Sequence, residues 1–553
     1  MVHRDKCESL LSANFTLLDT FVMLSYLIVV IAIGFYYSGK KDQSFNDYFL
    51  AGKNVGWFAV GMSIFATNIS SEHFIGLAGA GATRGLAVGQ IELMAIFILI
   101  LLGWVVAPIY MKSGVVTTPE FLERKFDSSL RRPFAALSIV IYIFTKITVS
   151  LFAGGILFYK LFGMSIYTSA VLVVLFTGLY AILGGANAVI RTSVPQGIVL
   201  IAGAVLLTAF GLNAVGGFSG LEHKLPSDFF HMFKPASDPD YPWTGVLFGA
   251  PIIAFWYWLT DQYFIQKVLS AKSINDARRG SLFAASLKVL PLFVLVLPGL
   301  LAAVIFPGLS GDQTYPTLLA SSLLPSGVKG VVVAGLLAAI MSSLASTFNA
   351  TAALITNDFY KPKHPRATDR ELVLVGRLTT TATVVVAILS IPLVKLITSQ
   401  VYLFLQSIQG FVSPPIAAVF LVAFISKEKG NTKAAIWTLV VGETVGVCRL
   451  ICETLVKSGS VDNPLFRQIT NINFLHFSIF LFLFSVMLFL SLSILLRERF
   501  ENKTLDKKID GSTAVATLGV EAAGNTAVGT FRSNALFSVL ILLVVASLWS
   551  IWF

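Results

Sequence analysis

Long apolar stretches separated by short polar connections follow one another along almost the whole chain. A stretch of about 17 to 25 apolar residues is long enough to cross the hydrocarbon core of a bilayer. The pattern therefore predicts an all-α polytopic membrane protein with a lipid bilayer as its surroundings. We expect about fourteen spans, near residues 19–38, 54–80, 85–111, 133–162, 165–185, 189–214, 244–268, 280–308, 327–357, 371–396, 399–425, 432–455, 474–497 and 533–553.

Polar residues interrupt two of these spans. Gly61–Gly81 reads GMSIFATNISSEHFIGLAGAG, with a polar segment from Thr67 to His73 at its centre. Polar backbone groups persist at membrane depth only where they face protein or a watery cavity, and broken helices mark substrate and ion sites in secondary transporters. A second interruption, WYWLTDQ from Trp256 to Gln262, follows about five spans later. Two broken helices in matching positions predict an inverted repeat with the binding site between them.

The two interruptions also suggest how the chain is divided. Each would lie in the first helix of a five-helix repeat, and the remaining helices would surround this core. We expect an extracellular N-terminus and an additional first helix (1–52), repeat one (53–214), an extracellular loop (215–240), repeat two (241–425), two additional helices (426–497), a cytoplasmic linker (498–532) and a last helix (533–553).

Composition and charge support the membrane class. Hydrophobic residues make up 56% of the chain and charged residues 12%, and the mean hydropathy is +0.81. The net charge of +11 could indicate nucleic-acid binding, but the basic residues gather in every second connection, as in 124–132 and 267–279. By the positive-inside rule these connections are cytoplasmic. We therefore expect both termini outside a plasma membrane, or a bacterial inner membrane, and no nucleic-acid partner.

Six segments of the chain carry a family pattern. They are DYFLAGKNVGWFAVGMSIFATNISSEHFIGLAGAG, GVVTTPEFLERKF, WYWLTDQYFIQKVLSAKS, ASLKVLPLFVLVLPG, GVVVAGLLAAIMSSLASTFNATAALITNDFY and LQSIQGFVSPPIAAVF. These segments strongly resemble the solute:sodium symporters, and within them the sodium/glucose cotransporter branch, and the resemblance extends from about residue 20 to residue 495. It implies a LeuT-like fold with a 5+5 inverted-repeat core and alternating access driven by sodium, and we expect a monomer.

Hydroxyl groups suited to sodium occur in the span AGLLAAIMSSLAST. Sodium is a hard cation that takes about five or six oxygen ligands, and carbonyls of an unwound helix with hydroxyls of a facing helix can supply them. Close packing of helices explains such small residues equally well. The resemblance implies a specific ligand set, the carbonyls of Ala66, Ile69 and Ala339 and the hydroxyls of Ser342 and Ser343.

Two charged residues fall inside apolar spans. Glu92 lies in VGQIELMAIFILILLGW and Lys288 in FAASLKVLPLFVLVLPG, and facing lipid would cost either about 2.5 kcal/mol or more. We expect both to face the bundle interior, although a helix-end carboxylate and a snorkelling lysine are the alternatives. A hydroxyl-rich neutral ligand needs several donors and acceptors and an aromatic face. The resemblance implies that Asn68, His73, Glu92, Lys288 and Gln406 hydrogen-bond a sugar.

Aromatic and amide groups near the breaks also have ordinary explanations. Tyr257 and Trp258 could belong to an interfacial belt or to the bundle core. His73 could be a satisfied core residue, and Gln406 could hydrogen-bond across helices. The resemblance implies instead that Tyr257 closes the inner gate and that Trp258 lies alongside it.

Several positions depart from the pattern of the resembling sugar cotransporters. Ser193 stands where many of them have an acidic residue, which leaves a second cation site or proton coupling open. Ala254 stands where some of them have a polar sugar contact, and Ala95 where one bacterial relative has a serine, so we expect the hexose pocket to recognise a different hydroxyl pattern. Outside the core, we expect Glu443 and Arg449 to form a structural pair.

Together these features predict a sodium-coupled symporter that imports a hexose such as glucose or galactose. A symporter for inositol, another polyol or another small solute is the nearest alternative, and a sensor or channel that binds sugar without transporting it is a further one. The sequence has no phosphate-binding loop, no catalytic triad and only three scattered cysteines. We therefore expect neither an enzyme nor an ATP-driven pump.

Overall fold

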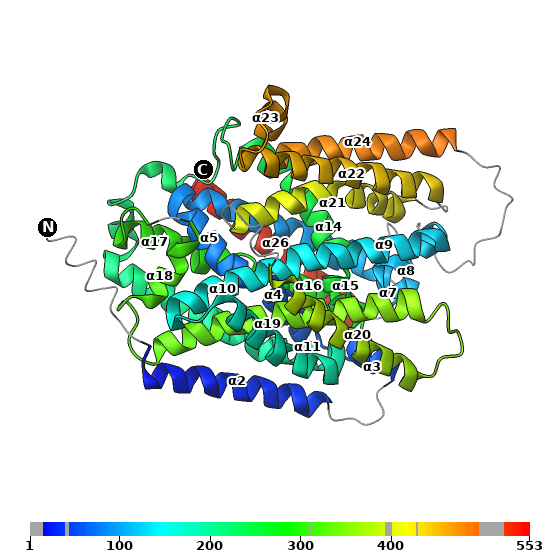
Figure 1. Ribbon diagram of the computed structural model, residues 1–553, viewed down its shortest axis with the longest axis horizontal. Helices are drawn as coiled ribbons and strands as arrows, with labels where there is room; N and C mark the ends of the chain where they lie inside the picture. Colours follow the sequence, from blue (N-terminus) through cyan, green and yellow to red (C-terminus); the bar gives the residue numbers. More distant parts are fainter. Residues whose placement is uncertain (1–14, 39–43, 310, 393–400, 427–429, 497–524) are drawn as a thin grey trace.

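Long helices, most of them aligned with the long axis of the molecule, build the structure (Figure 1). This computed structural model describes residues 15–38, 44–309, 311–392, 401–426, 430–496 and 525–553. Residues 1–14 and 39–43 of the expected N-terminal part (1–52) lie outside the described residues, as do residues 498–524 of the expected linker (498–532). The last eight residues of that expected linker, 525–532, are helical instead, because α26 (Asn525–Ile551) begins there.

The first half of the chain forms eleven described helices and four short 3₁₀ or π-helical turns. They are α2 (Leu17–Ser38), α3 (Phe45–Leu50), η1 (Ala51–Lys53), α4 (Trp57–Asn68), α5 (Ser71–Arg84), η2 (Gly85–Val88), α6 (Gly89–Leu101), η3 (Leu102–Val106), α7 (Ala107–Ser113), α8 (Thr118–Lys125), α9 (Ser128–Ile141), η4 (Tyr142–Ile147), α10 (Thr148–Phe162), α11 (Ile166–Val215) and α12 (Gly217–Glu222).

The second half continues in the same way. Its elements are η5 (Ser227–Phe230), α13 (Trp243–Phe248), α14 (Ala250–Leu259), α15 (Gln262–Leu269), α16 (Ile274–Leu287), η6 (Leu292–Val296), α17 (Leu297–Ile305), η7 (Gly311–Gln313), α18 (Thr314–Ala320), α19 (Val328–Leu354), η8 (Ile355–Tyr360), α20 (Asp369–Ser390), α21 (Val401–Ile425), α22 (Thr432–Lys457), α23 (Pro464–Asn471), α24 (Phe474–Leu495) and α26 (Asn525–Ile551).

Local sequence explains where many helices begin and end. Ser165, Ser273 and Thr368 each cap a helix start, because the side-chain oxygen accepts the backbone N–H three residues later. Gly114 and Gly163 follow the last residues of α7 and α10 with left-handed φ values of 68° and 64°. Such capped boundaries fix the lengths of the apolar spans between them.

The number of membrane crossings depends on how interrupted helices are counted. Eleven described helices are long and apolar enough to span a membrane, and the pair Trp243–Leu259 and Gln262–Leu269, bent by 51°, makes a twelfth. Two of the eleven, Ser71–Ser113 and Ile166–Val215, are 43 and 50 residues long, about twice what one crossing needs. They are interrupted at Gly85 and Gly185, whose φ values are 67° and 53°. Counting each of these two helices as two crossings gives the expected fourteen.

A nearly fully enclosed helix occupies the centre of the bundle. The segment Val328–Tyr360 contains α19, and 94% of the residues in its most apolar 18-residue stretch are buried inside the protein. Helices α4, α11 and α15 pack against it. By contrast α2 lies along one edge of the molecule, and α22 and α24 lie along the opposite edge (Figure 1). The two interrupted helices therefore meet around α19, in the middle of the fold.

Both ends of the described chain lie at the same end of the molecule. The carboxylate of Asp19, at the start of α2, accepts the backbone N–H groups of Gly327 and Gly330, both at 2.8 Å. The carbonyl of Trp552, after α26, accepts the N–H of Met232 at 2.8 Å. The long connections after α11 and α17 cover this end (Figure 1). Chain ends on the same side of the molecule agree with an even number of crossings.

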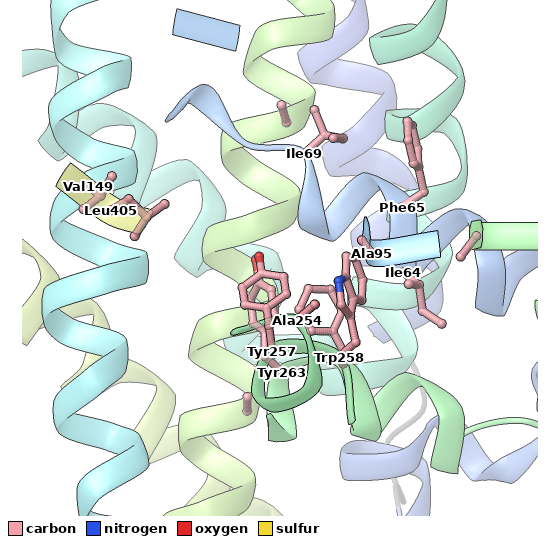
Figure 2. Close-up of a cluster of buried hydrophobic side chains, with 14 of the residues drawn as sticks. Ile64, Phe65, Ile69, Ala95, Val149, Ala254, Tyr257, Trp258, Tyr263 and Leu405 are labelled. Atoms are coloured by element: carbon pink, nitrogen blue, oxygen red, sulfur yellow. The ribbon is translucent and has the colours of Figure 1, made fainter. Parts of the chain in front are cut away.

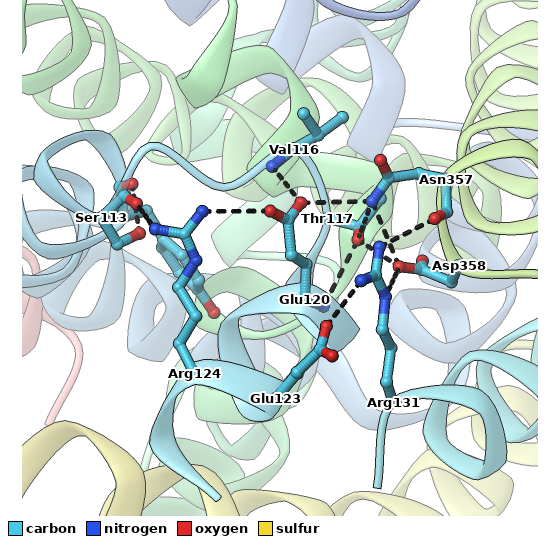
Figure 3. A network of polar contacts seen from close by, with 10 residues as sticks. Ser113, Val116, Thr117, Glu120, Glu123, Arg124, Arg131, Asn357 and Asp358 are labelled. Atoms are coloured by element: carbon cyan, nitrogen blue, oxygen red, sulfur yellow. Dashed lines mark hydrogen bonds and ion pairs between the residues drawn. The ribbon is translucent and has the colours of Figure 1, made fainter. Parts of the chain in front are cut away.

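A polar network ties elements together at the opposite end (Figure 3). Arg131 of α9 donates to the Asp358 carboxylate at 2.7 Å and to Glu123 of α8 at 2.5 Å. Asp358 also accepts the hydroxyl of Thr117 at 2.8 Å, and Thr117 accepts from Asn357 at 3.0 Å. The motif residues around 115–126 therefore lock α8 and α9 onto the turn that follows α19.

One loop carboxylate gives the fold an expected pH dependence. Asp312 of η7 accepts the backbone N–H of Val401 at 3.1 Å, and burial raises the pKa of Asp312 to about 6. Between about pH 4 and pH 6, the Asp312 carboxyl therefore keeps its proton in the folded protein but has lost it in the unfolded chain, where its pKa is the ordinary 3.8. Stability is greatest below pH 4 for this group and falls as pH rises through about 6. We expect Asp312→Asn to gain stability relative to the parent by up to about 3 kcal/mol across this interval.

The measurement is the thermal unfolding midpoint of parent and Asp312→Asn in detergent between pH 4 and pH 7. The difference between the two should grow with pH, because only the parent carries the titrating carboxyl. A difference that is the same at every pH would show that the Asp312 carboxyl does not titrate in this range.

Candidate functional site

The first interrupted helix breaks between α4 and α5. Ile69 and Ser70 have extended backbone angles, with ψ values of 110° and −177°, so two residues leave the helix at its centre. The last carbonyls of α4, including that of Ala66, then lack the amide partners that a continuous helix would supply. The Thr67 carbonyl accepts the hydroxyl of Tyr263 at 2.8 Å. This break therefore presents backbone oxygens inside the protein.

The second interrupted helix breaks between α14 and α15. Thr260 and Asp261 are the non-helical residues, and the Asp261 carboxylate accepts the N–H of Tyr263 to start α15. Tyr257 and Trp258 occupy the last turn before the break. Figure 2 shows Tyr257, Trp258 and Tyr263 gathered here, with Ile69 of the first break above them in the view. Aromatic side chains thus surround the point where the two breaks approach each other.

The central helix α19 presents hydroxyl groups toward α4 and α15. Ser342 and Ser343 are buried, as is Ala339 one turn earlier. The hydroxyl of Ser343 lies 2.6 Å from that of Tyr263, and Ser346 meets the hydroxyl of Thr67 at 3.0 Å. The Ser343 hydroxyl is therefore linked through Tyr263 to Thr67 at the first break, whereas the Ser342 hydroxyl lies 3.1 Å from that of Ser193 in α11. Oxygen atoms of this kind suit a hard monovalent cation.

A small internal cavity of about 40 Å³ lies beside the breaks. It has room for a few water molecules at most, so a hexose or inositol ring does not fit the cavity in this structure. All seven residues predicted to bind substrate line it, namely Asn68, His73, Glu92, Tyr257, Trp258, Lys288 and Gln406.

An ion pair crosses this cavity. The ammonium of Lys288 pairs with the Glu92 carboxylate and donates to the side-chain oxygen of Asn68 at 2.8 Å. Asn68 in turn donates to the Tyr257 hydroxyl at 3.2 Å. The side chains of Lys288 and Glu92 are only 2% and 4% exposed, as expected for charges that face the bundle interior. One connected set of donors and acceptors thus joins α4, α6, α14 and α16.

Sequence reasoning missed two polar residues of the cavity. Tyr402 donates to Glu92 at 2.9 Å, and Gln409 is among the lining residues. Both are on α21 with Gln406, at spacings of four and three residues, which places all three on one helix face. That spacing was the available signal. Ala95 and Ala254, where the sequence predicts a departure from the sugar cotransporters, also line the cavity.

The expected pair of Glu443 and Arg449 was wrong. Arg449 pairs with Glu453 at 3.0 Å instead, and also donates to the carbonyls of Thr470 and Ile472. Residues six apart on a helix lie on different faces, whereas residues four apart are neighbours. Arg449 therefore fastens α22 to the connection that leads into α24.

Comparison with known proteins identifies the fold and the family pattern. The sequence pattern of the sodium:solute symporter family matches residues 48–442. The substrate-bound outward-open state of a Na⁺-coupled sialic acid symporter superposes with a TM-score of 0.74, over 87% of this chain and 98% of that one. At 22% identity this likeness concerns the fold, and it confirms the LeuT-like architecture.

Two curated relatives are similar over most of their length. Sodium/myo-inositol cotransporter 2 of Oryctolagus cuniculus is 38% identical over 504 residues, which cover 84% of this chain and 74% of the relative. Sodium/glucose cotransporter 1 of Ovis aries is 36% identical over 521 residues, covering 86% and 78%. Similarity to the inositol and the glucose transporter is thus nearly equal.

Proposed function

The chain belongs to the sodium:solute symporter family and is a sodium-coupled solute symporter, and from this premise we propose that its solute is a cyclic polyhydroxylated compound. The first candidate is a hexose such as glucose or galactose, imported by alternating access. The second is a cyclic polyol such as myo-inositol, which the name of the 38% identical relative favours. The family consists of transporters, and the expectation that the chain is not an enzyme is thereby confirmed.

The cavity beside the two broken helices carries this proposal. A neutral polyol exposes hydroxyls that donate and accept, and the cavity offers an ammonium, a carboxylate, amides and a phenol, all buried. Trp258 and Tyr257 add aromatic faces suited to the apolar C–H side of a ring. In our proposal Asn68, His73, Glu92, Lys288 and Gln406 hydrogen-bond the solute. Tyr257 closes the inner gate, with Trp258 alongside it, and must move for the solute to leave.

We propose that sodium is held by five oxygens between α4 and α19. The carbonyls of Ala66, Ile69 and Ala339 and the hydroxyls of Ser342 and Ser343 form the set, because the break frees carbonyls next to the buried serines. Sodium bound there would fasten the first break to the central helix and so order Asn68 for the solute.

The ion supplies the energy for accumulation. One charge that moves through about 100 mV yields about 2.3 kcal/mol. At about 1.4 kcal/mol per tenfold concentration ratio, this supports a roughly fiftyfold solute gradient even before a sodium gradient is added. One sodium per cycle is therefore enough for concentrative uptake.

The arrangement in the membrane follows from the same proposal. Basic connections lie inside, both termini lie outside, and the protein works as a monomer in a plasma membrane or a bacterial inner membrane. Residues 53–214 and 241–425 are the two repeats. The start of α2 and the end of α26 at one end of the molecule support this topology.

Uptake into proteoliposomes tests the proposal. Labelled glucose, galactose and myo-inositol are supplied with inward sodium, potassium or proton gradients, with a negative interior potential in each case. We expect concentrative uptake of one of these solutes with sodium alone. The solute with the highest ratio of maximal rate to KM separates the hexose from the inositol candidate.

Three results would speak against it. Uptake of none of the three solutes would exclude this substrate class, and equal uptake under proton and sodium gradients would exclude strict sodium coupling. Saturable binding of a sugar without uptake under any gradient would identify a sensor, the alternative that the sequence leaves open.

A further inference from the structure

The hydroxyl of the buried Tyr263 connects three elements beside the predicted sodium ligands. It donates to the Thr67 carbonyl at 2.8 Å and lies 2.6 Å from the Ser343 hydroxyl. Thr67 is in the last turn of α4, Ser343 is in α19, and Tyr263 follows directly after the second break. One phenol group therefore contacts both broken helices and the helix that carries the serines.

The direction of these hydrogen bonds follows from the number of protons. A phenol has one proton to donate but can also accept. A carbonyl cannot donate, so the Tyr263 proton goes to Thr67, and Ser343 must donate in the contact between the two hydroxyls. The Ser343 proton consequently points at Tyr263, and the lone pairs of its oxygen point elsewhere. A cation binds a hydroxyl through those lone pairs, so Ser343 has the orientation that sodium requires.

The neighbouring serine repeats this arrangement. Ser193 donates its proton to the Val189 carbonyl at 2.7 Å and lies 3.1 Å from Ser342. By the same argument, Ser342 donates to Ser193. Each predicted hydroxyl ligand thus has its proton taken by a residue that is not itself in the predicted ligand set.

We propose that Tyr263 is a positioning residue of the sodium site, because it holds the Ser343 hydroxyl with the oxygen free for the ion. This inference rests on the proposed function, since it takes Ser343 to be a ligand. Residues that orient metal ligands typically change metal affinity by about 10- to 100-fold when they are mutated. Phenylalanine at position 263 keeps the ring and its packing and removes the hydroxyl, which is both the acceptor for the Ser343 proton and the donor to the Thr67 carbonyl.

Tyr263 also shares a cation with the predicted gate. The ammonium of Lys146, from the π-helical turn η4, lies 4.4 Å from the Tyr263 ring centre and 3.7 Å from that of Tyr257. It is also 3.5 Å from the Asp261 carboxylate. Both rings are therefore held by one buried charge at the second break.

Binding of radioactive sodium to the purified full-length chain, without solute, tests this role. Parent, Tyr263→Phe, Ser343→Ala and the double variant are compared. We expect Tyr263→Phe to raise the sodium Kd about tenfold. The double variant should bind within about twofold of Ser343→Ala alone, because Tyr263 acts through Ser343. Tyr110→Phe is the matched control, because the buried Tyr110 donates its hydroxyl to a carbonyl of α14, that of Leu259, at 3.0 Å, and should keep the parent Kd.

The outcomes separate this inference from the ligand assignment. A weakened Ser343→Ala with a parent-like Tyr263→Phe would overturn the inference alone, and so would losses that add in the double variant. A parent-like Ser343→Ala would overturn the ligand assignment and the inference with it. Sodium-induced stabilisation against thermal unfolding gives the same comparison for any variant too unstable for binding measurements.

Discussion

Replacing Lys288 by methionine should abolish concentrative uptake and lower the free energy of unfolding by about 3 to 5 kcal/mol. Lys288 is the buried partner of Glu92 and the donor to Asn68. Methionine has a similar length and no charge, so the Glu92 carboxylate would stay buried without its cation. Loss of one partner from a buried ion pair leaves an uncompensated charge, which costs more than loss of both. Uptake and the unfolding midpoint in detergent are the two measurements.

A second substitution separates the two effects. In Lys288→Met combined with Glu92→Gln no buried charge is left over, so most of the lost stability should return while uptake stays absent. Lys234→Met is the control for uptake, because Lys234 is also buried but pairs at 2.6 Å with Asp228, whose side chain is 73% exposed, in a loop away from the cavity. Uptake by the double variant at the parent rate would show that the pair does not bind solute. A single Lys288→Met variant as stable as the parent would contradict the burial argument.

Ser343→Ala should raise the sodium concentration for half-maximal uptake by about 10- to 100-fold. A hydrogen bond or ligand contact to a charged group contributes about 1.5 to 3 kcal/mol, and each 1.4 kcal/mol is about tenfold in affinity. Maximal uptake at saturating sodium should fall much less, since the solute contacts remain. The measurement is a sodium titration of uptake with the solute held above its KM.

The control for this titration is Ser478→Ala. Ser478 is a buried serine of the peripheral helix α24, and its hydroxyl donates to carbonyls of its own helix, those of Phe474 and Leu475. Its sodium curve should match the parent curve. If Ser343→Ala also matched the parent, the proposed sodium site would have to be moved away from α19.

The polar interruptions in the apolar pattern predicted the centre of the fold. A helix that places Asn68 and His73 at membrane depth can persist only inside protein, and the structure breaks this helix at Ile69. The same reasoning applies to Glu92 and Lys288. A charged side chain in an apolar span is expected to face the bundle interior, because its exposure to lipid is costly. The sequence therefore sufficed to predict a buried polar centre, while the roles of its residues in binding stay predictions.

Contacts between distant helices could not be predicted in this way. Tyr402 and Glu92 are 310 residues apart, and nothing in the local pattern of either span indicates that they meet. The partner of Arg449 is a different case. Glu453 lies four residues away on the same helix, so helical spacing alone favours it over Glu443, which lies six residues away. The contacts of Tyr263 could not be predicted either. Its hydroxyl bonds with Thr67 and Ser343, which are far away in the sequence.

The opposite charges of Lys288 and Glu92 cancel inside the cavity, and this has an electrical consequence. A neutral solute that enters adds no charge, so the current carried through the protein per transported molecule reports sodium alone. Simultaneous recording of current and labelled uptake would therefore count the ions that accompany each molecule. A ratio of one elementary charge per molecule would fit a single sodium site, and a ratio of two would require a second cation path.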